Sequence, residues 1–117
     1  MNKTKILFIV VLLFLVLSAS KCMEELFGTN YNIKIINRST KIITKVTIDG
    51  DEVYSGMLNP GEFVFRTENI MQGSNPVLAN FSDGTWYQEN DQYFPNSCED
   101  NNIEMNIWAT TITVTCR

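Results

Sequence analysis

Apolar residues are arranged in two different ways along the chain. Near the start, an unbroken apolar run, Ile6–Leu17, follows Lys3 and Lys5 and precedes the small residues Ser18-Ala19-Ser20. This three-part pattern is typical of a secretory signal peptide. A membrane-spanning helix needs about 20 apolar residues, so the shorter run predicts cleavage and no membrane span in the mature chain. The expected organisation is a signal peptide over residues 1–20, an N-terminal tether over 21–30 and one domain over 31–117.

Beyond residue 30, apolar and polar residues alternate with the period of β-strands. The alternation is strongest over residues 42–48, which are rich in the β-branched residues that favour strands. It ends at Asp49-Gly50, a pair that favours a two-residue hairpin turn because both positions need positive φ. One face of this strand is expected to carry Ile42, Thr44, Val46 and Ile48, and the other face Ile43, Lys45 and Thr47.

Other turn signals divide the rest of the chain. Asn59-Pro60-Gly61-Glu62 predicts a type II turn, and Ser82-Asp83-Gly84 predicts a second hairpin. Segment 69–76 reads as a loop, and Gln88–Asn102 reads as a long polar loop. No Gly or Pro interrupts residues 103–115, so we expect one long bent strand there, or two strands with a bulge near Ala109.

Seven or eight short strands with frequent turns and no helical period predict an all-β fold. We expect a small antiparallel β-sandwich, immunoglobulin-like or transthyretin-like, with a small β-barrel as the alternative. The predicted core consists of Ile33, Ile35, Val46, Ile48, Val53, Phe63, Phe65, Leu78, Phe81, Trp86, Met105, Ile107, Ile112 and Val114.

The amino-acid composition excludes several classes of function. The 117 residues include no His, 9 Lys+Arg and 13 Asp+Glu, for a formal charge of −4. Without His, neither a Ser–His–Asp triad nor a His-ligated zinc site can form. The acidic balance argues against nucleic-acid binding, which needs a positive surface. No nucleophile with a visible base occurs, so we expect a protein that is not an enzyme and has no cofactor.

Three cysteines leave one unpaired in an oxidising compartment. We expect a Cys98–Cys116 disulfide that ties the long loop to the last strand, with Cys22–Cys116 as the alternative. Cys22 follows the signal peptide and is a candidate for lipidation, although Lys21 is larger than the residue that normally precedes a lipidated cysteine. The expected location is therefore extracellular or periplasmic, with or without a lipid anchor.

Acidic and asparagine residues supply weaker candidates. Calcium binds six to eight oxygen ligands, and the long loop carries four carboxylates that a disulfide could draw together, but turn chemistry and solubility are the favoured explanation. The candidates are Glu89, Asp91, Glu99 and Asp100. Asn37 and Asn80 each begin an Asn-X-Ser triplet, which matters as a glycosylation site only in a eukaryotic source.

Aromatic residues provide the main functional candidates, because exposed Trp and Tyr beside amide side chains are common in recognition surfaces. The predicted ligand-binding residues are Trp86, Tyr87, Tyr93, Phe94 and Trp108. We expect a secreted or surface-tethered module that binds a protein or glycan at a cell surface through aromatic residues at the long loop. The alternative is a secreted inhibitor or immunity-type protein that blocks a basic enzyme or toxin. The sequence shows no clear exposed apolar surface of the kind that a membrane-active protein needs.

Overall fold

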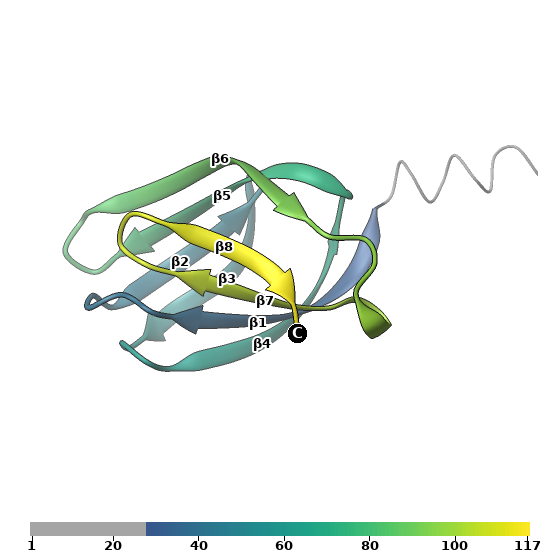
Figure 1. Ribbon diagram of the computed structural model, residues 1–117. Coiled ribbons are helices and arrows are strands. Elements are labelled where there is room, and N and C mark those ends of the chain that lie inside the picture. The colour runs from purple at the N-terminus through teal and green to yellow at the C-terminus, as the bar shows by residue number, and fades with distance from the viewer. Residues whose placement is uncertain (1–27) are drawn as a thin grey trace, which may run out of the picture.

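The computed structural model describes residues 28–117, which form a sandwich of two four-stranded sheets (Figure 1). This confirms the predicted all-β sandwich, and the sheets do not close into a barrel. The strands are β1 (Thr29–Asn37), β2 (Ile43–Ile48), β3 (Asp51–Leu58), β4 (Phe63–Ile70), β5 (Gly73–Phe81), β6 (Trp86–Phe94), β7 (Asn102–Ile107) and β8 (Ile112–Cys116). The predicted signal peptide and Cys22 lie outside the described residues. No helix within residues 28–117 is long and apolar enough to cross a membrane.

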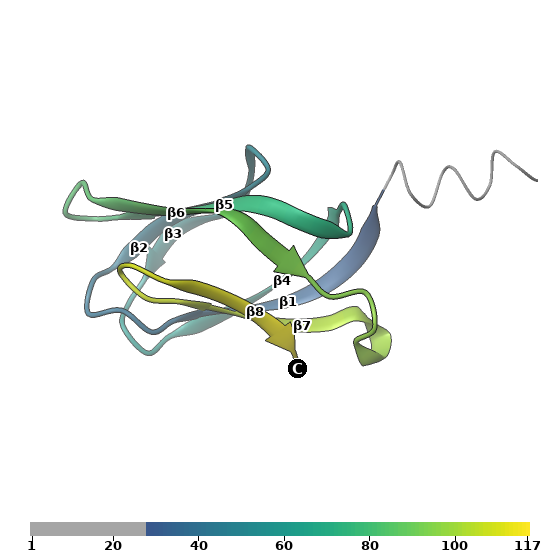
Figure 2. The same cartoon turned by 45° about the horizontal axis from the view of Figure 1, so that its top comes forward.

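We call the two layers sheet A, with strand order β4-β1-β7-β8, and sheet B, with order β3-β2-β5-β6 (Figure 2). Adjacent strands are antiparallel except β1 and β7, which run parallel. We call the end at which β1 begins the proximal end and the opposite end the distal end. The connections β2–β3, β4–β5 and β6–β7 lie at the proximal end, and the other four lie at the distal end (Figure 1).

The predicted turns are confirmed. Asp49 and Gly50 both have positive φ, 50° and 82°, and Ile48 pairs with Asp51 across the hairpin. In the second turn, the Glu62 amide donates to the Asn59 carbonyl at 3.0 Å, and Gly61 has φ of 84°. Only glycine adopts this conformation without steric cost, which is why it follows Pro60 in a type II turn.

Strand β2 differs from strict alternation at its start. The pairing of β2 with both of its neighbours shifts between Ile43 and Lys45. A β-bulge of this kind adds a residue and changes which side chains share a face. Ile43 is therefore fully buried together with Val46, and the prediction that these two residues lie on opposite faces is wrong.

The two predicted loops are largely strand. Residues 73–76 begin β5, and residues 88–94 belong to β6, which pairs with β5 over most of its length. Pro76 lies where the pairing shifts between Asn75 and Val77, a position at which its missing N–H is tolerated. The long-loop prediction for Gln88–Asn102 is therefore wrong, and only residues 95–101 connect β6 to β7.

Strands β7 and β8 form an antiparallel hairpin, not one bent strand. Ile107 pairs with Ile112, and the Trp108 amide donates to the Thr111 carbonyl at 2.8 Å. A four-residue loop can reverse the chain without glycine, so the expected bulge near Ala109 is a turn.

The core fills the space between the sheets. Ten of the fourteen predicted core residues are buried, and fully buried residues that the prediction omitted include Tyr31, Ile43, Phe94 and Ile103. Phe63, Phe65 and Trp86 are exposed, and Leu78 is half-buried, so these four predictions are wrong. On β4, an edge strand, the even positions Val64 and Ile70 face the core instead.

The predicted Cys98–Cys116 disulfide is present. It joins the β6–β7 connection to the end of β8 across 18 residues of sequence. The Cys22–Cys116 alternative is therefore wrong.

Candidate functional site

The five predicted ligand-binding aromatic residues do not form one site. Trp86 and Tyr87 begin β6 at the distal end, where Trp108 also begins the β7–β8 turn. Tyr93 and Phe94 end β6 at the proximal end. Because nine extended residues span roughly 26–30 Å, the two pairs on β6 cannot contact one small ligand.

Phe94 is fully buried and offers no surface to a ligand in this structure. Its ring packs against Tyr31 with 5.9 Å between centroids. The Tyr31 hydroxyl is buried without a hydrogen-bond partner among the described residues. Burial, and then the charge of Tyr93, raise the pKa of Tyr31. Tyr93 itself is 54% exposed.

Tyr87 and Trp108 are less available than Trp86. Tyr87 packs against the core, and its hydroxyl donates to Glu89 Oε2 at 2.9 Å. That hydrogen bond is the main reason that the pKa of Tyr87 is raised, because ionisation would remove the donor. Trp108 is partly exposed, whereas Trp86 is 62% exposed.

Trp86 borders a shallow hollow on the outer face of sheet B. The hollow measures about 250 Å³ and is lined by Leu78, Asn80, Trp86 and Gln88. Pairing of β5 with β6 sets Asn80 opposite Trp86 and Leu78 opposite Gln88. No lining side chain carries a charge, and within residues 28–117 no hydrogen bond occupies the side-chain amide of Asn80 or Gln88. The hollow thus presents an indole ring beside two amides that are free to bind.

The turn before Trp86 is held by a polar network. The Asp83 carboxylate accepts hydrogen bonds from the Thr85 hydroxyl and from the Thr85 amide, and it lies 3.0 Å from Lys41 Nζ. These contacts lower the pKa of Asp83 to about 2. The hydrogen bond from the Thr85 hydroxyl has the largest effect, followed by the Thr85 amide and Lys41. This network fixes the β5–β6 turn from which Trp86 projects.

We expect the Asp83 carboxyl to titrate with a midpoint of about 2 instead of the usual 3.8. Because the folded-state pKa is lowered, the stabilisation is complete above about pH 4 and is lost as the pH falls through 2. Carboxyl-carbon NMR across this range measures the midpoint directly. A midpoint near 3.8, or an unchanged midpoint in Thr85→Val, would contradict the network.

Sheet A carries an exposed surface that was not predicted from the sequence. On its outer face, Phe63 and Phe65 are 53% and 52% exposed and pack edge to face at 5.5 Å. Lys34 Nζ lies 4.4 Å from the Phe63 centroid, and the Arg117 guanidinium lies 5.1 Å from the Phe65 centroid. We call Lys34, Phe63, Phe65 and Arg117 the aromatic–cationic face. The sequence of β4 places Phe63 and Phe65 on the same side of the strand, but alternation alone does not tell which side of a strand faces the core.

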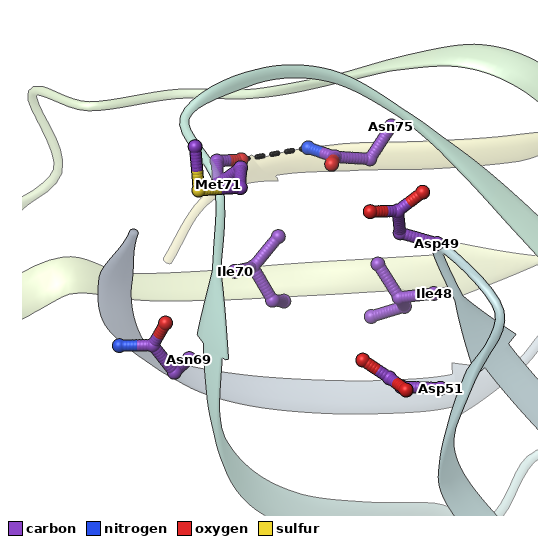
Figure 3. A pocket seen from close by; sticks show the side chains of 7 residues that line it. All are labelled: Ile48, Asp49, Asp51, Asn69, Ile70, Met71 and Asn75. Carbon is purple, nitrogen blue, oxygen red and sulfur yellow. Dashed lines mark hydrogen bonds between the residues drawn. The ribbon is translucent and has the colours of Figure 1, made fainter. Parts of the chain in front are cut away.

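A third feature is a half-open pocket of about 230 Å³ at the proximal end (Figure 3). Two hydrogen bonds hold the segments around it. The Asn75 side chain donates to the Met71 carbonyl at 2.7 Å, and the Asp49 amide donates to the Pro76 carbonyl at 2.8 Å. The lining residues are Ile48, Asp49, Asp51, Asn69, Ile70, Met71 and Asn75.

The calcium candidates are dispersed. Glu89 lies on β6 and accepts the Tyr87 hydroxyl, Asp91 follows on the same strand, and Glu99 and Asp100 lie in the short 3-10 helix after Cys98. Across residues 28–117, no three His, Cys, Asp or Glu side chains gather closely enough to hold a metal ion. The structure therefore does not bring the predicted loop carboxylates together.

The two asparagines of the glycosylation triplets differ sharply. Asn37 is fully buried, and its amide nitrogen donates to the carbonyls of Lys41 and Leu58 at 2.7 and 2.8 Å. A glycan on that nitrogen is incompatible with the folded domain. Asn80 is half-buried and lines the Trp86 hollow.

Comparisons with known proteins support the fold and give no function. No protein-family model matches the chain, and no curated protein matches it. Among solved structures, it is similar to the "NMR structure of the protein from Eubacterium rectale", with a TM-score of 0.54 and 12% sequence identity. The match covers 74% of this chain and 87% of that chain. At this identity, the likeness extends to the fold alone.

Proposed function

We propose that this protein is a secreted or surface-tethered, non-enzymatic module that binds a glycan at the Trp86 hollow. The observation that carries the proposal is an exposed indole ring beside two uncommitted amides in an uncharged hollow. Glycan recognition is favoured over protein recognition at this site because the hollow is small and neutral. None of the other predicted aromatic residues lines the hollow.

The chemistry of the hollow suits an uncharged sugar ring. One side of a pyranose presents mainly C–H groups, which can pack on an indole ring, while its hydroxyls both donate and accept hydrogen bonds. Asn80 and Gln88 each offer a carbonyl acceptor and an NH₂ donor, and Leu78 provides apolar contact. Because the hollow lies on a regular pair of strands, its shape is set before the ligand arrives, which reduces the entropic cost of binding.

Binding to immobilised polysaccharides tests the proposal. We expect the protein to be retained by at least one neutral polysaccharide from a panel that includes cellulose, chitin and mannan, with little dependence on salt. Trp86→Ala should weaken this binding by about thirtyfold, the effect of losing a central aromatic contact of roughly 2 kcal/mol. Intrinsic fluorescence then reports contact with the indole ring.

Trp108→Ala is the matched control, since it removes the second tryptophan at the distal end but not from the hollow. It should bind as the unaltered protein does. The glycan proposal is contradicted if no polysaccharide retains the protein, or if the two tryptophan substitutions weaken polysaccharide binding equally. Retention that salt abolishes would also contradict it, because the hollow carries no charge.

A further inference from the structure

The aromatic–cationic face of sheet A is independent of the Trp86 hollow and differs from it in chemistry. Three of the six basic residues in the described chain, Lys34, Arg38 and Arg117, gather on or beside it. Arg38 is placed there by its hydrogen bond to Asn106 Oδ1 at 2.9 Å. The described chain has eleven acidic residues. By strand alternation, Glu104 is the only one of these eleven at an outward-facing strand position of sheet A. A domain that is acidic as a whole thus has one positively charged face.

A further apolar side chain, Ile36, lies on this face next to Phe63. Ile36 is only 5% exposed, yet it does not belong to the core between the sheets. It is paired with Phe63 on one side and with Asn106 on the other. Ile36 and the two phenylalanines therefore form an apolar patch on the outside of the sandwich. The two phenylalanine rings are its exposed part, and large aromatic side chains exposed side by side favour an interaction surface.

We propose that the aromatic–cationic face binds the surface of a membrane that contains anionic lipids. Charge complementarity supports this occupant, because lysine and arginine attract anionic headgroups while aromatic side chains enter the boundary between headgroups and acyl chains. The side chains project from the outer face of a sheet, so the rings and the cations can meet a broad, flat target together. Since the rest of the domain is acidic, an anionic membrane attracts this face and repels the others.

The arrangement leaves the Trp86 hollow free. The hollow lies on the outer face of sheet B, and the aromatic–cationic face lies on the outer face of sheet A, so the two sites are on opposite sides of the sandwich (Figure 2). A domain lying on a membrane through sheet A would point the hollow away from it. Failure of the glycan proposal would not affect this inference.

Sedimentation with vesicles tests the inference. The protein carries Cys22→Ser so that a lipid on this cysteine cannot anchor it, and it is mixed with vesicles of phosphatidylcholine alone or of phosphatidylcholine with phosphatidylglycerol. We expect sedimentation with the mixed vesicles at low salt, much less with phosphatidylcholine alone, and loss of binding as salt increases. Lys34→Gln and Arg117→Gln should each weaken binding by about fivefold, the usual effect of one cation at an anionic surface.

Substitution of the rings separates apolar from purely electrostatic binding. Phe63→Ser with Phe65→Ser should also reduce sedimentation, and because both rings are about half exposed the folded state should persist, as checked by circular dichroism. Lys45→Gln is the matched control, since Lys45 is an exposed lysine on sheet B. The inference is overturned if neither vesicle sediments the protein, if both do so equally, if the double serine variant binds unchanged, or if Lys45→Gln has the effect of Lys34→Gln.

Discussion

Phe94→Ala should destabilise the domain by about 3–5 kcal/mol, the usual cost of truncating a buried phenylalanine. Phe94 is fully buried, and its ring contacts Tyr31, the largest of the fully buried side chains. Truncation leaves a cavity beside a tyrosine whose hydroxyl already lacks a partner among the described residues. Urea denaturation followed by circular dichroism measures the loss as a lower transition midpoint with little change in slope.

Tyr93→Ala is the matched control from the same strand. Tyr93 is the neighbouring aromatic residue and is 54% exposed, so its loss should change the unfolding free energy by less than about 1 kcal/mol. Similar losses for the two variants would mean that the ends of β5 and β6 are paired differently. A small loss for Phe94→Ala would restore Phe94 as a surface candidate.

Replacing Cys98 and Cys116 together by alanine should cost about 3 kcal/mol, the estimate for opening a loop that spans 18 residues. Most of this loss reflects greater freedom of the unfolded chain, and some reflects packing, because Cys98 is buried against the core. Denaturation with and without a reducing agent measures it. Reduction of the unaltered protein should give nearly the same loss, and the double variant should not respond to the reducing agent.

The pairing itself can be checked by chemistry. A thiol reagent should not modify Cys98 or Cys116 in the unreduced protein, even after unfolding. Modification of either cysteine under those conditions, or a loss of less than about 1 kcal/mol in the double variant, would contradict a stabilising disulfide.

The turns were predictable from sequence because their chemistry is local. Asp49-Gly50 and Asn59-Pro60-Gly61-Glu62 contain residues that suit a particular backbone conformation, and both turns occur where expected. The Cys98–Cys116 pair also followed from counting cysteines, once Cys22 was set aside. Such signals depend on a few neighbouring residues and not on the rest of the fold.

Strand β6 shows what local signals cannot give. Its central residues, Gln88–Gln92, are polar and lack the β-branched side chains that favour strands, yet Gln88, Glu89 and Gln92 pair with β5. Tertiary pairing outweighs propensity in such a segment. The predicted cluster of aromatic residues required this segment to be a loop. Because the segment is an extended strand, the aromatic residues at its two ends lie far apart. Of the five predicted residues, only Trp86 lines the hollow on sheet B.

Strand β4 shows a second limit. Phe63 and Phe65 are large and hydrophobic, like core residues, and Val64 between them is smaller. A prediction based on hydrophobicity therefore assigns the two phenylalanines to the core, although Val64 is the residue that packs there. Alternation divides a strand into two faces, but which face is buried depends on the partner sheet. The aromatic–cationic face was therefore not predictable from the order of residues alone.

The parallel pairing of β1 with β7 has a consequence for biosynthesis. Asn32 pairs with Asn102 and Asn37 with Ile107, so β1 stays unpaired on that side until a strand about 70 residues further along the chain has been made. A nascent chain that stops before residue 102 leaves one side of the isoleucine-rich β1 unpaired, and such open edges promote aggregation. Cys116, the last residue of β8, is then available to form its disulfide with Cys98. The growing chain should therefore be prone to aggregation until β7 has been made and paired with β1.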